Sequence, residues 1–110
     1  MEYDKSEASR YFLKVAENAE RDLKELGQKC ERNRVYERDF DDRLATFYVY
    51  NYLHGRTFLD TREQLVTALR ELALETSTPS EAKDPETFEK FRQFYIGELI
   101  GRYADNAEGA

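Results

Sequence analysis

The stretch "TFYVYNYLHGRTF", residues 46–58, decides the fold, because it fits either the end of a helix or a strand. With a helical period it completes a row that begins upstream, formed by Tyr36, Phe40, Leu44, Phe47 and Asn51, and Gly55 stands where that helix would end. With a period of two it alternates, which is typical of a strand and would place a hairpin turn at residues 54–55. We favour the helix, because the helical period begins in a charged segment upstream and no adjacent segment offers enough strand to build a sheet.

The segment 4–27 carries the clearest helical pattern. Its apolar side chains recur at steps of three and four, at Ala8, Phe12, Val15, Ala19, Leu23 and Leu26. Asp4 and Glu7 have capping-box spacing at its start, and Gly27 is expected to end it.

Two further helices are predicted in the second half of the chain. The first, within residues 59–76, has Asp60 as the expected N-cap and a buried row formed by Leu65, Leu69 and Leu72. The second, within residues 84–106, begins with Asp84 and Pro85, a favoured first-turn pair. Its apolar stripe consists of Phe88, Phe91, Tyr95 and Leu99.

These patterns predict an all-α fold, a small four-helix bundle-like domain, in which facing apolar stripes bury one another. The alternative is an α+β fold with a short hairpin at residues 46–59. We expect one helical domain over residues 1–110, with a loop at 76–84 and a frayed tail at 105–110.

Charge and composition favour some classes of protein over others. The 110 residues include 17 basic and 23 acidic ones, a formal charge of −6, and direct nucleic-acid binding is not expected without a concentrated basic surface. Cys30 is the only cysteine, so a structural zinc site or an internal disulfide is not expected. No apolar run is long enough to span a bilayer, and the acidic start "MEYDKSEASR" does not fit a secretory signal, so we expect a cytoplasmic protein.

His54 is the only histidine, and it defines the alternative class of a small enzyme or a histidine phosphotransfer module. Phosphotransfer domains are small helical bundles too, but they place the reactive histidine in the middle of an exposed helical face. Here Gly55 follows at once, where the helix is expected to end, so we interpret His54 as a side chain that caps free carbonyl groups. The sequence contains no phosphate loop, dinucleotide fingerprint or calcium loop, and we expect no cofactor, no metal and no catalysis.

The tyrosines of residues 46–58 point to a binding surface. Successive helical residues are 100° apart, so one buried stripe cannot cover all of these rings, and some must face outward. Because tyrosine is enriched at protein interfaces, we predict that Tyr48, Tyr50 and Tyr52 contact a partner.

The motif "GELIG" marks a second candidate contact. Gly97 and Gly101 lie one turn apart with Phe94 on the same side, and each glycine costs a helix about 1 kcal/mol relative to alanine. A close helix contact would offset this cost. We favour a contact inside the bundle over one between molecules, while a homodimer stays open. Glu98 and Arg102 exclude a membrane contact.

The sequence therefore predicts a non-enzymatic protein that binds another protein as an adaptor, a regulatory subunit or an inhibitor. Its predicted contact residues are Tyr48, Tyr50, Tyr52, Phe94, Gly97 and Gly101. An acidic mimic of nucleic acid is a further alternative, weakened by the 17 basic residues mixed among the acidic ones.

Overall fold

The computed structural model describes residues 3–56, 59–75 and 77–104. They form four α-helices, α1 (Lys5–Arg32), α2 (Glu37–His54), α3 (Arg62–Ala73) and α4 (Pro85–Ala104), with a 3₁₀ turn, η1 (Arg34–Tyr36), before α2. No strand occurs in these three ranges, so the all-α prediction is confirmed. The hairpin alternative is wrong for residues 46–54, which belong to α2, whereas residues 57–58, residue 76 and the predicted tail at 105–110 lie outside the described part.

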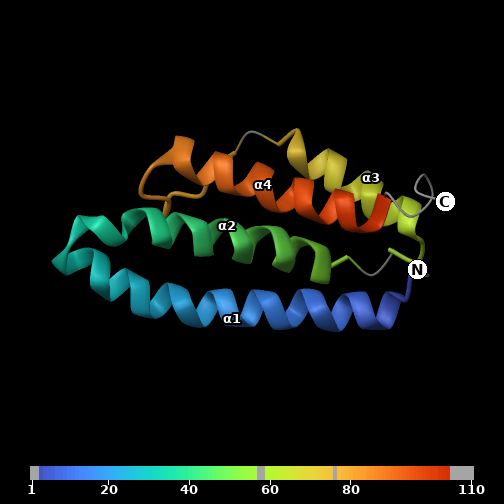
Figure 1. Ribbon diagram of the computed structural model, residues 1–110, viewed down its shortest axis with the longest axis horizontal. Helices are drawn as coiled ribbons and strands as arrows, with labels where there is room; N and C mark the ends of the chain where they lie inside the picture. Colours follow the sequence, from blue (N-terminus) through green and yellow to red (C-terminus); the bar gives the residue numbers. More distant parts are fainter. Residues whose placement is uncertain (1–2, 57–58, 76, 105–110) are drawn as a thin grey trace.

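The molecule is elongated, with extents of 49 × 24 × 23 Å. α2 runs through the middle, with α1 along one side and α4 along the other, and α3 packs mainly on α4 (Figure 1). The α1–α2 pair and the α3–α4 pair therefore meet along α2 and α4.

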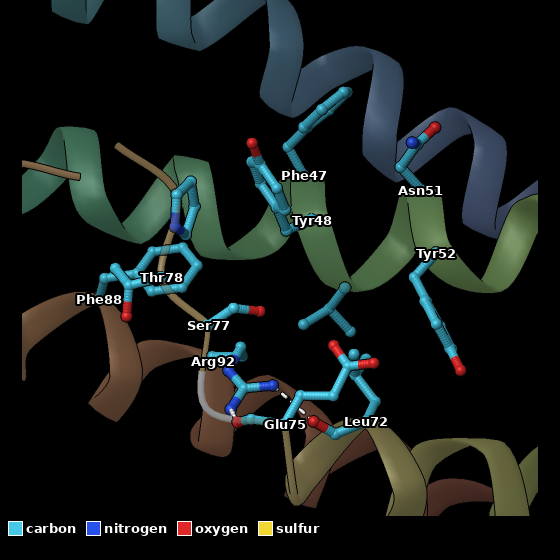
Figure 2. Close-up of a pocket in the computed structure, with 12 residues that line it drawn as sticks. Phe47, Tyr48, Asn51, Tyr52, Leu72, Glu75, Ser77, Thr78, Phe88 and Arg92 are labelled. Atoms are coloured by element: carbon cyan, nitrogen blue, oxygen red, sulfur yellow. Dashed lines mark hydrogen bonds between the residues drawn. The ribbon is translucent and has the colours of Figure 1, made fainter. Parts of the chain in front are cut away.

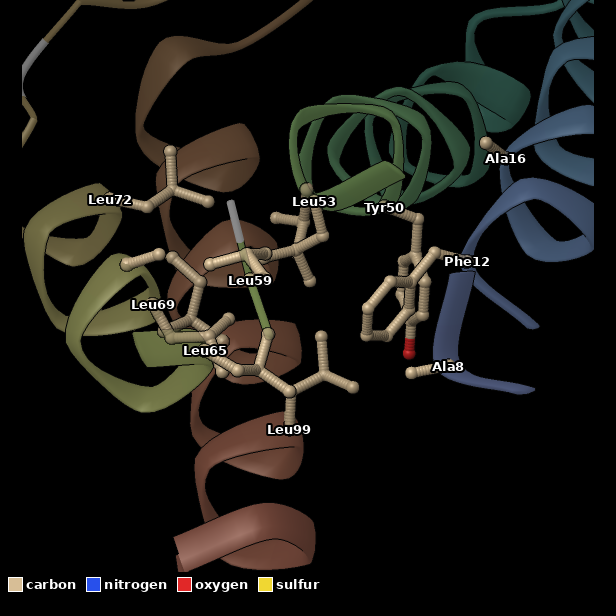
Figure 3. Packing of buried hydrophobic residues seen from close by; sticks show 13 residues of the cluster. Ala8, Phe12, Ala16, Tyr50, Leu53, Leu59, Leu65, Leu69, Leu72 and Leu99 are labelled. Carbon is tan, nitrogen blue, oxygen red and sulfur yellow. The ribbon is translucent and has the colours of Figure 1, made fainter. Parts of the chain in front are cut away.

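The main core lies where all four helices come together, toward the beginning of α1 and the end of α2. Figure 3 shows Leu53 and Leu59 facing the leucines of α3, with Phe12 and Tyr50 packed beside them. The predicted α3 row of Leu65, Leu69 and Leu72 is buried here. Full burial of one leucine contributes about 2 kcal/mol, so this cluster holds the two helix pairs together.

The starts of α1 and α3 have local side-chain caps. Asp4 caps α1 as predicted, since its carboxylate accepts hydrogen bonds from the backbone N–H groups of Ser6 and Glu7. The predicted cap of α3 is wrong by one residue, because Thr61 is the N-cap and forms a capping box with Gln64. Asp60 instead makes an ion pair with Lys5, at 2.6 Å, and so ties the start of α3 to the start of α1.

The predicted end of α1 at Gly27 is also wrong, because the helix continues to Arg32. Gly27 sits in the helix where it passes α2, and a Cβ atom at this position would lie 3.7 Å from the Phe40 ring. The helix ends where Asn33 turns to extended backbone and its side chain accepts from the N–H of Val35. Because α1 packs on α2 here, the helix continues beyond the glycine.

The buried face of α2 differs from the predicted row. Leu44 is buried, but Asn51 is exposed, while Val49 and Leu53 are almost fully buried. The predicted end of this helix is correct, since Gly55 is the C-cap and its N–H bonds back to Asn51. None of the described helices is long and apolar enough to cross a membrane.

Candidate functional site

A cleft of about 530 Å³ opens between α2, the end of α3 and the start of α4 (Figure 2). We call it the aromatic cleft. Its walls combine aromatic, aliphatic and polar side chains from Phe47, Tyr48, Val49, Asn51, Tyr52, Leu72, Glu75, Ser77, Thr78, Pro79, Phe88 and Arg92. A cleft of this size is within the usual range for binding pockets.

Tyr48 stands at the open edge of the aromatic cleft with 38% of its surface exposed. Its ring packs edge to face against those of Phe47 and Phe88, with centroids 5.8 and 6.1 Å away. These two contacts hold the ring in place. Burial of its inner part, together with the nearby carboxylate of Glu81, raises the pKa of the Tyr48 phenol. The hydroxyl therefore stays protonated, and it donates to Glu81 at 3.5 Å.

Tyr52 lines the same cleft one turn further along α2 and is half-buried. The guanidinium of Arg56 lies 3.9 Å from the centre of its ring, a cation–π contact that fixes the ring against the end of α2. Two of the three predicted tyrosines thus share one cleft, and both are preorganised by neighbours.

Arg92 forms the floor where α4 passes the end of α3. Only 3% of it is exposed, and its guanidinium donates to the carbonyl oxygens of Leu72 and Glu75 and to the carboxylate of Glu89 (Figure 2). Carbonyl groups at a helix end attract positive charge, so Arg92 joins α3 to α4 while keeping its own charge paired. Burial alone would raise the pKa of Glu89, but hydrogen bonds from Arg92 and Gln93 outweigh it and leave that pKa lowered.

Asp41 of α2 anchors the connection between α3 and α4. It is 1% exposed, and its two carboxylate oxygens accept the backbone N–H groups of Lys83 and Asp84, at 2.7 and 2.9 Å. Asp84 in turn accepts from the hydroxyl of Thr87, which lowers the pKa of Asp84. The start of α4, and with it one wall of the cleft, is therefore anchored on α2.

Tyr50 is buried, so the exposure on which its predicted partner contact depended is wrong. Only 6% of its surface is accessible, and its ring packs against Tyr11 and Phe12 of α1 at 5.8 and 6.0 Å. Burial, followed by a hydrogen bond with Tyr11, raises the pKa of Tyr50 far above its ordinary value. Tyr50 serves as a core side chain on the flank of α2 opposite the cleft.

The predicted contact of Gly97 and Gly101 inside the bundle is also wrong. A Cβ atom at either position would meet nothing within 4 Å, and Phe94 on the same helix is 57% exposed. Both glycines border a second hollow of about 480 Å³, which we call the α1–α4 groove. Its walls are Tyr11, Tyr50, Gly97, Glu98, Leu99, Gly101 and Arg102.

His54 lies in neither hollow. It is the last residue of α2, half-buried beside a small pocket of about 140 Å³. Its Nδ1 atom is buried and has no hydrogen-bond partner among the described residues, where the imidazole therefore does not cap the helix through that nitrogen as predicted. Within the described ranges, no three His, Cys, Asp or Glu side chains are grouped so that they could hold a metal ion.

Sequence patterns did not identify the polar residues of the cleft. Asp41 and Arg92 look like ordinary charged residues of amphipathic helices, and their backbone partners lie 17 to 43 residues away in the chain. A signal was present for Arg92, because it falls on the same side of α4 as Phe88 and Leu99.

Comparison with known proteins does not extend this description, since no family model matches the chain and neither a curated protein nor a solved structure matches it significantly.

Proposed function

We propose that this protein binds another protein through the aromatic cleft and acts on it as an adaptor, a regulatory subunit or an inhibitor, without catalysis of its own. The observation that carries the proposal is the cleft itself, an open hollow of about 530 Å³ whose rim includes Tyr48 and Tyr52. Aromatic side chains held rigid at a cleft edge are the usual centres of binding energy, because little conformational freedom is lost on contact.

Apolar surface beside the cleft supports the same proposal. Leu74, just after α3, is 81% exposed, and the cleft continues inward to Leu72, Val49 and Phe88. A partner side chain such as leucine, methionine or phenylalanine could enter there and exclude water from both surfaces.

The charges around the cleft favour a partner segment that is basic next to its apolar anchor. Glu75 lines the cleft and makes no side-chain ion pair with the described part of the chain, and Glu81 stands beside Tyr48. The positive charge of Arg92 is already paired with Glu89. The unpaired charge at the opening is therefore negative, which would steer basic residues of a partner into place.

Site-specific photocrosslinking tests this proposal. A photoreactive phenylalanine analogue placed at Tyr48 should crosslink one protein reproducibly in extracts of the native host, and the same analogue at Val35, an exposed site on η1, should not. Equal labelling from positions 48 and 35 would count against the cleft as a binding site.

Affinity measurement with the crosslinked protein, once purified, completes the test. Replacing Tyr48 and Tyr52 with alanine should weaken binding about 30-fold or more, since aromatic residues at the centre of an interface contribute about 2 kcal/mol or more. Val35→Ala is the matched control and should leave the affinity unchanged. An unaltered affinity in the double variant would remove the cleft from the binding mechanism.

A further inference from the structure

No other described element packs on one face of α4. Phe94, Gly97 and Gly101 lie one turn apart from each other on the side of α4 that faces away from the core. This face borders the α1–α4 groove, on the flank of α2 opposite the aromatic cleft, since Tyr50 lines the groove whereas Tyr48 and Tyr52 line the cleft. A surface that exposes a phenylalanine beside a hollow is suited to contact.

The glycines of this face make no contact that requires a glycine in the described part of the molecule. Each costs α4 about 1 kcal/mol relative to alanine, and apart from the backbone of α4 itself no described atom comes within 4 Å of where a Cβ atom would be. Glycines on a helix surface allow another helix to approach its backbone closely, and that contact would offset the cost.

The charges of this face indicate which helix would pack on it. Glu98 and Arg102 lie one turn apart along the groove, and neither forms an ion pair with any residue of the described ranges. Arg102 rests over the ring of Tyr11, at 4.7 Å, and both residues line the groove. If a second α4 crosses the first in the antiparallel sense, a two-fold axis between these residues brings Glu98 of each copy to Arg102 of the other. The pattern is therefore complementary to itself.

We infer that the outer face of α4 is the interface of a homodimer, in which two copies of α4 cross antiparallel at Gly97 and Gly101. The two Glu98–Arg102 pairs fix the direction of the crossing. The α1–α4 groove of each molecule receives the flank of the other helix. This inference does not depend on the function proposed for the aromatic cleft.

Charge reversal on two separate variants tests the interface and its charge pairing. Glu98→Arg places a second guanidinium against Arg102 of the other copy, and Arg102→Glu places two carboxylates together, so each variant alone should have a dimer dissociation constant raised by at least about tenfold. An equimolar mixture of the two variants should dimerise again, because one chain then carries two basic residues and the other two acidic ones. Analytical ultracentrifugation measures all three samples against the wild type, whose mass should approach twice 13.0 kDa.

Several outcomes would overturn the inference. A wild-type protein that stays at 13.0 kDa at the highest soluble concentration has no such interface. Dimers that survive in both separate variants form elsewhere, and a mixture that fails to dimerise contradicts the antiparallel pairing. Circular dichroism confirms that each variant is folded. Should either fail to fold, Gly101→Leu replaces it: a Cβ atom there meets nothing within 4 Å in the described part of the molecule, so the substitution should lower the mass while circular dichroism shows the fold retained.

Discussion

At the scale of single residues, the buried charged groups do the work of joining segments that are distant in sequence. Asp41 and Arg92 are both nearly inaccessible, and each directs its hydrogen bonds to backbone groups of another element rather than to an opposite charge alone. Backbone partners of this kind compensate a buried charge and satisfy groups at helix ends that have no partner within the helix.

Replacing Asp41 with alanine should lower the free energy of unfolding by about 3 kcal/mol, because two backbone N–H groups lose a charged acceptor. Urea denaturation followed by circular dichroism gives the value. Asp39→Ala is the control, since Asp39 is exposed on the same helix and should cost no more than about 1 kcal/mol through the helix dipole. Equal losses in the two variants would mean that the Asp41 bonds contribute nothing beyond surface charge.

At the scale of helices, the helix ends were predicted correctly where the capping side chains are close in sequence. Asp4, Gly55 and the Asp84–Pro85 pair mark the ends they were expected to mark, because a cap depends on side chains within a few residues. Gly27 was misleading because tertiary packing on α2 outweighs the local cost of a glycine inside α1.

The orientation of α2 could not be predicted from its own residues. Aromatic side chains lie nearly all around this helix, so the hydrophobic pattern has no strong direction and does not separate Tyr48 from Tyr50. The difference comes from the neighbours, since α1 brings Tyr11 and Phe12 over Tyr50. For the same reason the binding surface predicted on this helix included one core residue, Tyr50.

The two exposed glycines of α4 permit a direct measurement of helix propensity. Replacing Gly97 and Gly101 with alanine should raise the free energy of unfolding of the single molecule by up to about 2 kcal/mol, because the added methyl groups meet nothing. Denaturation at a protein concentration low enough to prevent association gives this number. Gly55→Ala, outside any helix interior, should gain little. A double variant less stable than the wild type would show that this face is covered within one molecule.

At the scale of the whole molecule, stability is distributed unevenly along its length. α1 spans about 42 Å of the 49 Å long axis, but its buried residues, Ala8, Phe12, Ala16 and Ala19, all lie before residue 20. Beyond Ala19, α1 and η1 contain no buried side chain, and they pack mainly on α2 and on each other.

Hydrogen exchange should reflect this gradient. Amides of α1 beyond residue 20 are expected to exchange through local opening at least about tenfold faster than those of residues 8–19, which open only with the main core. Mass spectrometry of peptides from the two halves measures the difference. Uniform protection along α1 would indicate that the second half is stabilised by contacts beyond those described.

The two hydrogen bonds of Asp41 also bear on how the two helix pairs align. Helices packed along their length offer similar ridges and grooves at every turn, so α4 could in principle slide along α2 by one turn, about 5.4 Å, and still find apolar contacts. A buried carboxylate accepts only where two N–H groups converge, and here that place is at Lys83 and Asp84. Asp41 therefore sets the axial register between the pairs, and its loss would broaden the set of alignments while the helices themselves persisted.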